Sequence, residues 1–369
     1  METQSNNSSI ALPPSPQGAP SGTSKWSLLA DCSHSSAIAI GQRCSLAFRR
    51  DGLHAYGGYI EGFLPHPFDC EAIASDDKIL AFLQLNDAPV ELTSYSSTYQ
   101  LRRGDAVVKF ESVKPADVNN LLPPRLVAVG DLVMIPDTDI LTALMDCVPK
   151  SGWGAMNVEM LGVVLDGYGA VATDNTSLAW CKPSPTGWTW NHEQRLILPR
   201  PFCTTLAHWV KVLGKDYKVY TDFVATVAAT WNTGEVLTGQ LPSDITEAVD
   251  FGPILDSVAQ SNYAPIPDKL TEYLDEASIF SEEIVLSKMP TPSAGQTVVQ
   301  GGVQLSTVGT TAWERNIVWA GGVSPPTPLP TPLKRLRTSL QYTQRMALRE
   351  QQIHLSNHDA TFFVIIATT

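Results

Sequence analysis

Three times along this 369-residue chain, a short amphipathic helix is followed by alternating runs typical of β-strands. The three helices begin near residues 77, 200 and 333, roughly 120 to 130 residues apart. A repeat of this length is that of a whole domain. The spacing therefore predicts an α+β protein built from three tandem units.

The middle copy carries the pattern twice. A helix is expected over 137–150, with Asp137 as its N-cap, and two β-rich runs meet at a tight turn over 166–169. A second helix is expected over 200–214, where a glycine ends it, and alternating strands follow. Residues 130–252 thus predict one half-unit used twice, so each unit is expected to contain two β-α-β-β-β-like halves.

The outer copies show the same order in a shorter form. A helix over 75–87 precedes strands around a turn at 103–105. A helix from residue 333 precedes a strand, a turn and a final strand at the end of the chain. Two stretches rich in proline and glycine, 289–302 and 320–332, are expected to be loops of the last copy.

Composition also suggests where the units begin and end. Segments 114–125 and 257–268 contain prolines and polar residues and are typical of linkers. The Ser/Pro/Gly-rich segment 1–24 has the composition of a disordered tail and lacks the order of a signal peptide. The expected domains are 25–125, 126–256 and 257–369.

Charge and cysteine usage exclude several classes of protein. The net charge of −12 argues against a surface coated in basic residues, although a few cations could still gather on one face. The six cysteines are scattered without metal-type spacing, which indicates buried thiols in a reducing, cytoplasmic compartment. No apolar run approaches the roughly 18 residues of a membrane helix. We therefore expect no metal, no cofactor and no membrane partner.

The stretch "GAVATDNTSLAW", residues 169–180, contains an unusual Thr-Asp corner. A glycosylation sequon at Asn175 is not expected to be used in a reducing compartment. No catalytic motif or partner for Asp174 is present either. Asp174 is instead expected to bond the backbone of its own loop, as short acidic side chains do in turns.

On these features the chain resembles the bacterial-type DNA polymerase sliding clamp, the β subunit of the replicase. The resemblance rests on "LGVVLDGYGAVATDNTSLAW" (161–180) and "LILPRPFCTTLAHWVKVLG" (196–214), because the family carries Ala-Thr-Asp-x-x-x-Leu-Ala and then a Pro-Arg that opens a helix. The runs "GQLPSD" (239–244) and "FFVIIATT" (362–369) fall where the family has Gly-x-Phe-Pro-Asp and a final aromatic, two aliphatics and Met-Pro. Residues 25–125 resemble it only in length and element order.

The chain also departs from the family pattern. Asn175, Thr176 and Ser177 stand where Gly-His-Arg usually follows Ala-Thr-Asp, and Ile366-Ala367 stands in place of Met-Pro. These changes indicate a divergent member, of a kind that a phage could encode. They fall where the family binds its partners, so we expect partner preference to differ here.

The resemblance implies a homodimeric ring with helices inside and sheets outside, closed by edge strands of the first domain of one chain and the last domain of the other. Such a ring encircles double-stranded DNA without reading sequence, is placed there by a clamp loader and tethers the DNA polymerase. Because a ring holds DNA topologically, it does not need tight phosphate contacts, which suits an acidic protein. The helices at 75–87 and 137–150 carry acids, so an uneven inner charge is expected.

The resemblance also implies two sets of site residues. The partner-peptide groove would be lined by Met160, Thr173, Asn175, Thr176, Ser177, Leu178, Pro242, Val364, Ile365 and Ile366. The DNA-facing cations would be Arg200, Lys211, Lys215, Lys334, Arg335 and Arg337.

Two other functions compete with this interpretation. An enzyme is disfavoured because the chain has no GxSxG, P-loop, GxGxxG or HExxH motif and no clustered metal ligands. A non-enzymatic phage structural or interaction protein built from β-rich domains is the remaining alternative. A threefold repeat with cationic second helices favours the clamp, since a structural protein has no reason to keep that order.

Overall fold

A computed structural model describes most of the chain. The described residues are 25–32, 45–57, 60–74, 77–86, 88–96, 98–112, 130–149, 158–184, 188–242, 249–290, 302–308 and 312–368. The tail expected over 1–24 and the linker expected over 114–125 lie outside these residues.

Two long antiparallel sheets organise the fold, and each of them combines strands from distant parts of the chain. The first has the order β4 (Ala72–Ala74), β1 (Ser45–Phe48), β2 (Gly52–Tyr56), β3 (Ile60–Pro65), β15 (Val236–Gln240), β14 (Thr226–Trp231), β13 (Tyr217–Thr221) and β8 (Asp131–Val133). The pairing of β3 with β15 joins the first copy of the repeat to the middle one.

The second long sheet repeats this arrangement between the middle and last copies. Its order is β12 (Leu196–Pro199), β9 (Gly162–Asp166), β10 (Gly169–Thr173), β11 (Ser177–Cys181), β23 (Phe362–Ala367), β22 (Gln352–Ser356), β21 (Arg345–Leu348) and β16 (Ala264–Pro265). Here β11 pairs with β23, from Ser177 opposite Ile366 to Cys181 opposite Phe362. The last strand of the chain is therefore built into the middle of a sheet.

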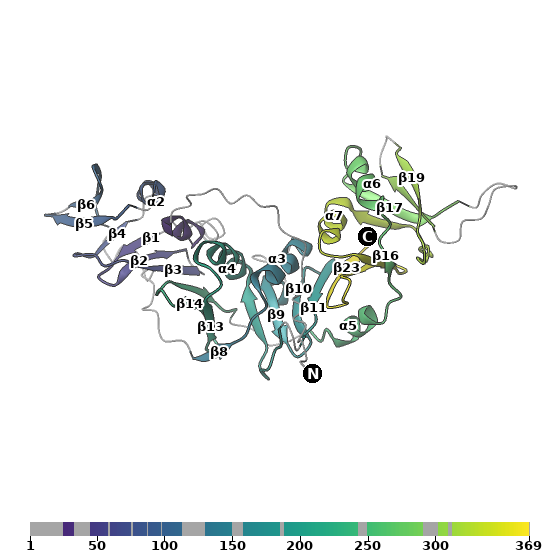
Figure 1. The fold of residues 1–369 in the computed structure, drawn as a ribbon, viewed down its shortest axis with the longest axis horizontal. Coiled ribbons are helices and arrows are strands. Elements are labelled where there is room, and N and C mark those ends of the chain that lie inside the picture. Colours follow the sequence, from purple (N-terminus) through teal and green to yellow (C-terminus); the bar gives the residue numbers. More distant parts are fainter. Residues whose placement is uncertain are drawn as a thin grey trace, which may run out of the picture.

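Two smaller sheets lie at opposite ends of the molecule (Figure 1). One contains β5 (Glu91–Tyr95), β6 (Thr98–Arg103) and β7 (Ala106–Phe110). The other has the order β19 (Glu314–Val318), β18 (Gly302–Thr307), β17 (Glu283–Lys288) and β20 (Leu329–Pro332). As β7 and β19 are outermost in these sheets, both molecular ends present an edge strand.

The helices of the described residues follow an arc of sheets. They are α2 (Asp77–Gln84), α3 (Thr138–Cys147), α4 (Arg200–Leu213), α5 (Gly252–Ala259), α6 (Leu270–Ala277) and α7 (Leu333–Leu340), with 3-10 turns η1 (Lys25–Ser27) and η3 (Val158–Leu161). Figure 1 shows α2, α4, α3, α7 and α6 following the concave side, whereas β8, β13 and α5 lie on the convex side. The fold is thus α+β, with α2, α4, α3, α7 and α6 on the inside of a curve and sheets outside.

The predicted helices follow from local sequence signals. Asp137 caps α3, because its side chain accepts a hydrogen bond from the Asp139 amide. Gly214 ends α4 with a φ of +90°, a value that glycine adopts without strain. The apolar face of α4 buries Phe202 and Trp209 completely, and the Trp209 indole donates to the Leu28 carbonyl 3.1 Å away. Sequence periodicity therefore placed these helices correctly, together with the turn between β9 and β10.

Several elements differ from the sequence expectations. The stretch 320–332, expected to be a loop, ends in the strand β20, which tolerates its prolines because it lies at a sheet edge. The linker expected over 257–268 contains the end of α5 and the strand β16. Helix α6 was missed, although Leu270, Leu274 and Ala277 form its buried stripe at helical spacing.

The turn between β9 and β10 provides a direct test of this backbone geometry. Gly169 has a φ of +121°, and a Cβ added there would collide with the carbonyl oxygen of Cys181. We expect Gly169→Ala to lower the free energy of unfolding by more than about 1 kcal/mol in urea denaturation. Gly167→Ala is the matched control, since open space surrounds that position. Equal stability of the two variants would contradict the assigned turn.

Candidate functional site

A groove of about 230 Å³ opens where the corner after β10, helix α5 and the strands β22 and β23 meet. Its lining comprises Met160, Thr173, Asn175, Thr176, Ser177, Leu178, Val249, Phe251, Ile254, Gln352, Ile365 and Ala367. The structure thus brings together seven of the ten residues that the sequence suggested for a partner groove. The lining is neutral and mostly apolar, the character of a pocket that binds apolar side chains.

The other three suggested groove residues lie elsewhere. Successive residues of a strand point to opposite faces, so Val364 and Ile366 turn away from Ile365. Both are fully buried in the main core, while Ile365 packs in the smaller core beneath the groove. Pro242, just after β15, is not part of the lining. The prediction that Val364 and Ile366 line the groove was therefore wrong. It included three consecutive residues of β23, whereas only the face of the strand that carries Ile365 lines the groove.

Helix α5 supplies the wall that sequence analysis missed. Phe251 is buried in the smaller core, and Val249 and Ile254 are each more than 40% exposed. Large apolar side chains exposed beside a groove mark a surface suited to a binding partner. Sequence periodicity did not indicate this helix, because it has only eight residues and begins with Gly-Pro.

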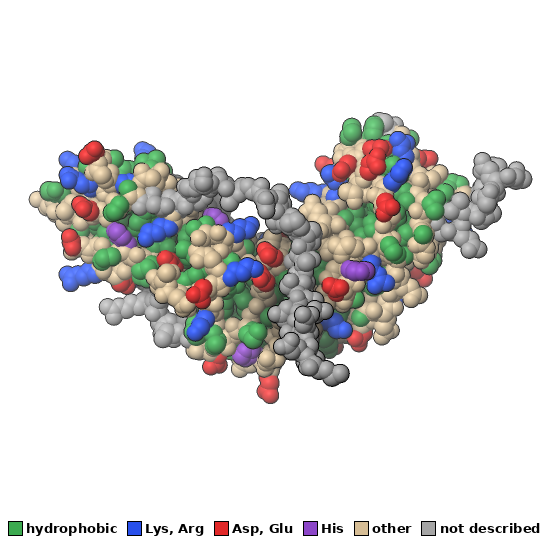
Figure 2. Space-filling model, in the orientation of Figure 1, with side chains coloured by type: hydrophobic (Ala, Val, Ile, Leu, Met, Phe, Trp, Pro, Cys, Tyr) green, Lys and Arg blue, Asp and Glu red, His purple; other side chains and the backbone are tan. Residues whose placement is uncertain are grey.

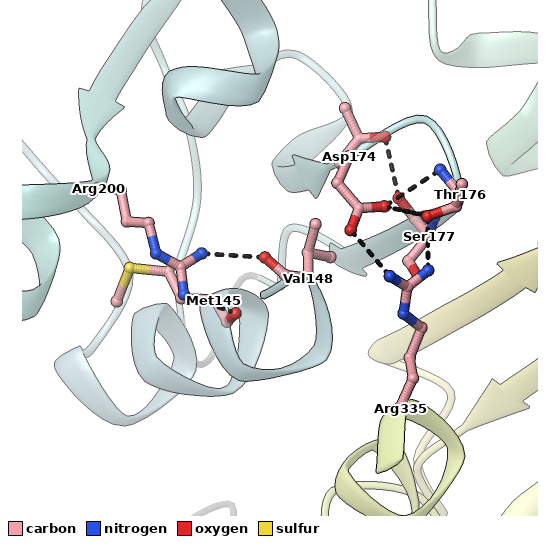
Figure 3. Close-up of polar contacts among 8 residues, drawn as sticks. Met145, Val148, Asp174, Thr176, Ser177, Arg200 and Arg335 are labelled. Carbon is pink, nitrogen blue, oxygen red and sulfur yellow. Dashed lines mark hydrogen bonds and ion pairs between the residues drawn. The ribbon is translucent and has the colours of Figure 1, made fainter. Parts of the chain in front are cut away.

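The corner over residues 174–177 is held by a single carboxylate (Figure 3). Asp174 Oδ1 accepts hydrogen bonds from the Thr176 amide at 3.1 Å and the Ser177 amide at 2.8 Å. It also accepts one from the Thr176 hydroxyl at 2.8 Å, while Asn175 adopts a φ of +68°. The prediction that Asp174 bonds its own loop is confirmed, and the bent backbone presents Asn175 and Thr176 to the groove.

Arg335 of α7 joins this corner and is not DNA-facing. Its Nη2 lies 3.2 Å from Asp174 Oδ2, and its Nη1 donates to the Thr176 hydroxyl at 2.6 Å (Figure 3). The Arg335 side chain is 8% exposed and that of Asp174 only 1%. The expectation for Arg335 was therefore wrong, because this cation is buried against the corner and binds the middle copy of the repeat to the last.

Arg200 makes structural contacts to helix α3. Its guanidinium donates to the carbonyl oxygens of Val148 at 2.9 Å and Met145 at 3.2 Å, at the C-terminal end of α3 (Figure 3). A cation at that end of a helix satisfies carbonyls that have no helical partner. Burial lowers the pKa of Arg200. Arg200 is half-buried in these contacts, and the expectation that it faces DNA stays a prediction.

The other four suggested cations are on or next to α4 and α7. Lys211 and Lys334 are exposed. Lys215 lies 2.7 Å from Asp137 and 3.9 Å from Asp139, and Arg337 pairs with Asp275 of α6. Surface pairs of this kind are weak but offset local charge. Figure 2 shows Lys and Arg side chains mixed with Asp and Glu on the face in view, so no uniformly positive surface appears there.

Two searches of the described residues concern metal ions and membrane-spanning helices. No group of three or more His, Cys, Asp or Glu side chains there could hold a metal ion. No helix of this part is long and apolar enough to cross a membrane. Burial raises the pKa of Cys147, Cys181 and Cys203 to about 12, so these thiols remain protonated at neutral pH.

The buried pair between Arg335 and Asp174 should be essential for stability. We expect Arg335→Met to lower the free energy of unfolding by about 3–5 kcal/mol, because it leaves a buried carboxylate without its cation. Lys334→Met, one residue away but exposed, should change it by less than about 0.5 kcal/mol. Urea denaturation of both variants measures the difference. A small effect at Arg335 would mean that the pair does not bind α7 to the corner.

Comparison with known proteins gives no match by sequence and clear matches by structure. No family model matches the sequence, and a search of curated proteins found no match. Solved structures match over nearly the whole chain. The DNA polymerase III subunit beta of Pseudomonas aeruginosa is similar with a TM-score of 0.70 and 15% identity, over 93% of this chain and 96% of that one.

Two further structures give the same result. A putative DNA polymerase III beta subunit of Eubacterium rectale has a TM-score of 0.70 at 11% identity, covering 94% of this chain and 98% of its own. The Helicobacter pylori beta clamp, bound to a DNA ligase peptide, has a TM-score of 0.66 at 12% identity, covering 94% and 99%. This chain has the fold of the DNA polymerase III beta-subunit sliding clamps.

Proposed function

We propose that this chain is a sliding clamp, a non-enzymatic protein that encircles duplex DNA and tethers a replicative DNA polymerase to it. The observation that carries the proposal is the arc itself, with helices on its concave side and two long sheets behind them. The match to the Pseudomonas aeruginosa beta subunit covers 93% of the chain. The proposal includes a clamp loader, because a closed ring must be opened to admit DNA. It also includes a cytoplasmic location.

The weak basic character of the inner helices is compatible with this function. Phosphate contacts produce strong, salt-dependent binding that slows movement along DNA. A ring is retained by its topology and needs only a few exposed cations, such as Lys211 and Lys334. The acids that neutralise Lys215 and Arg337 keep contact with DNA loose. The net charge of −12 is then no obstacle to encircling DNA.

Closure of the ring requires a second copy of the chain. The edge strands β7 and β19 lie at opposite ends of the arc, and edge strands pair readily with another chain. Beside the sheet that contains β19, Ile279 is 79% exposed, and Phe280 and Val308 are nearly half exposed. These apolar side chains support a head-to-tail homodimer in which β19 of one copy meets β7 of the other.

The groove beside α5 is proposed to bind hydrophobic peptides from the DNA polymerase and other partners. Support comes from its neutral, apolar lining and from the exposed Val249 and Ile254. The Helicobacter pylori clamp, which shares the fold, binds a peptide of DNA ligase. A short peptide with apolar anchors is therefore the partner that fits this groove.

The ring is tested by mass and shape. Purified protein at micromolar concentration is expected to sediment with twice the 40.0 kDa mass of the chain and to appear as closed rings in electron micrographs. Ile279→Asp should give monomers, because it buries a charge in the apolar contact. Val224→Asp, an exposed apolar site on a different loop, should leave the dimer intact. A stable wild-type monomer would count against the clamp.

The groove is tested by peptide binding. A fluorescent hydrophobic peptide from the cognate DNA polymerase is expected to bind the wild-type protein. Ile254→Asp should weaken binding at least tenfold, about 1.4 kcal/mol, because a carboxylate replaces an apolar contact in the wall. Val224→Asp again serves as the control, and anisotropy titration measures each affinity. Unchanged binding by the Ile254 variant would place the peptide elsewhere.

A further inference from the structure

One polar side chain at the groove belongs to a buried hydrogen-bond chain. Gln352 begins β22 and lines the groove, and His354 lies two residues along on the same face of the strand. The His354 Nε2 is 2.8 Å from Gln352 Oε1, and its Nδ1 is 2.9 Å from the Ser261 hydroxyl. Ser261 lies just beyond α5, so these hydrogen bonds connect two walls of the groove.

A nearby cation favours one assignment of the protons along these hydrogen bonds. Arg349 Nη2 donates to the Ser261 hydroxyl at 3.2 Å, on the Nδ1 side of the imidazole. The single proton of that hydroxyl has two acceptors within reach, the Ser257 carbonyl at 3.1 Å and His354 Nδ1 at 2.9 Å, so the charge of Arg349 and the Gln352 oxygen beside Nε2 decide the tautomer. Positive charge there favours the ring tautomer with a lone pair on Nδ1 and the proton on Nε2. Burial, and then the charge of Arg349, lower the pKa of His354 to about 4, so the ring is neutral at physiological pH.

This tautomer fixes the orientation of the Gln352 amide. The Nε2–H of His354 donates, and only the oxygen of the Gln352 side chain can accept. The amide NH₂ of Gln352 is then directed away from His354. Within the described part of the chain it makes no hydrogen bond, although its side chain borders the groove. The groove therefore carries an oriented donor on an otherwise mostly apolar wall.

We propose that Gln352 determines specificity in the groove: His354 holds its amide so that the NH₂ group donates to a carbonyl oxygen of the bound peptide. A neutral carbonyl is favoured over a carboxylate, because no cation is among the described residues that line the groove and could compensate a negative charge. The recognition step rests on the proposed peptide-binding function, whereas the amide orientation does not. His354 acts as a positioning residue, since it is 2% exposed and reaches the peptide only through Gln352.

The orientation is tested on the free protein. In ¹⁵N NMR spectra at pH 7, His354 should show a protonated Nε2 and an unprotonated Nδ1. Gln352→Glu should raise the pKa of His354, because a carboxylate then accepts from Nε2 and favours the charged ring. Gln351→Glu is the matched control, since Gln351 is exposed and outside the groove lining. A ring protonated on Nδ1 would overturn the proposal.

Recognition is tested with the fluorescent polymerase peptide. Gln352→Leu should weaken binding roughly 2- to 10-fold, the effect of one lost hydrogen bond. Gln352→Glu should weaken it further, because an acceptor then faces the peptide carbonyl, and Gln351→Glu should bind like wild type. Equal or tighter binding by the Gln352→Glu variant would overturn the specificity role. If the wild-type protein bound no peptide, the proposed function and the recognition step would both fail, and the NMR result would still decide the orientation.

Discussion

The pairing of β11 with β23 is the contact on which the rest of the structure depends. It builds the last strand of the chain into a sheet that begins with the middle copy, along five residue pairs. The equivalent pairing of β15 with β3 does the same between the middle and first copies. Because neither sheet can form from one copy alone, the curvature of the arc is set by hydrogen-bonded strands rather than by flexible connections. The groove beside β23 exists only because this joint is closed.

Two of the arginines expected to face DNA make structural contacts. Arg335 is buried against Asp174 across the β11–β23 joint, and Arg200 holds the C-terminal end of α3. A protein that bound DNA by phosphate contacts would have to leave such cations exposed. A ring that holds DNA by topology is free to bury them. The contacts of Arg335 and Arg200 are therefore compatible with the proposed retention of DNA by shape.

Sequence reasoning succeeded where a local signal decides the structure. The N-cap at Asp137, the glycine at 214 and the stripe of α4 each act within one helix, so periodicity and end signals sufficed. It failed where tertiary contacts decide. The sequence around Arg335, which follows the exposed Lys334, does not indicate that Arg335 is buried, because only the fold brings Asp174 next to it. Nor can a run of aliphatic residues such as 364–366 reveal which face meets a groove before the strand is paired.

The residues at which the chain leaves its relatives' pattern have a structural use. The Thr176 hydroxyl accepts a hydrogen bond from the Arg335 guanidinium and donates one to Asp174. This residue of the polar triplet therefore completes the contact between α7 and the corner. Its backbone shape is then constrained by the joint, with Asn175 held at a positive φ. A rim fixed in this way has little freedom to adapt to different peptides. In the proposed peptide-binding function, discrimination between partners would then rest on the opposite wall, where Gln352 and the exposed Ile254 of α5 are not part of that contact.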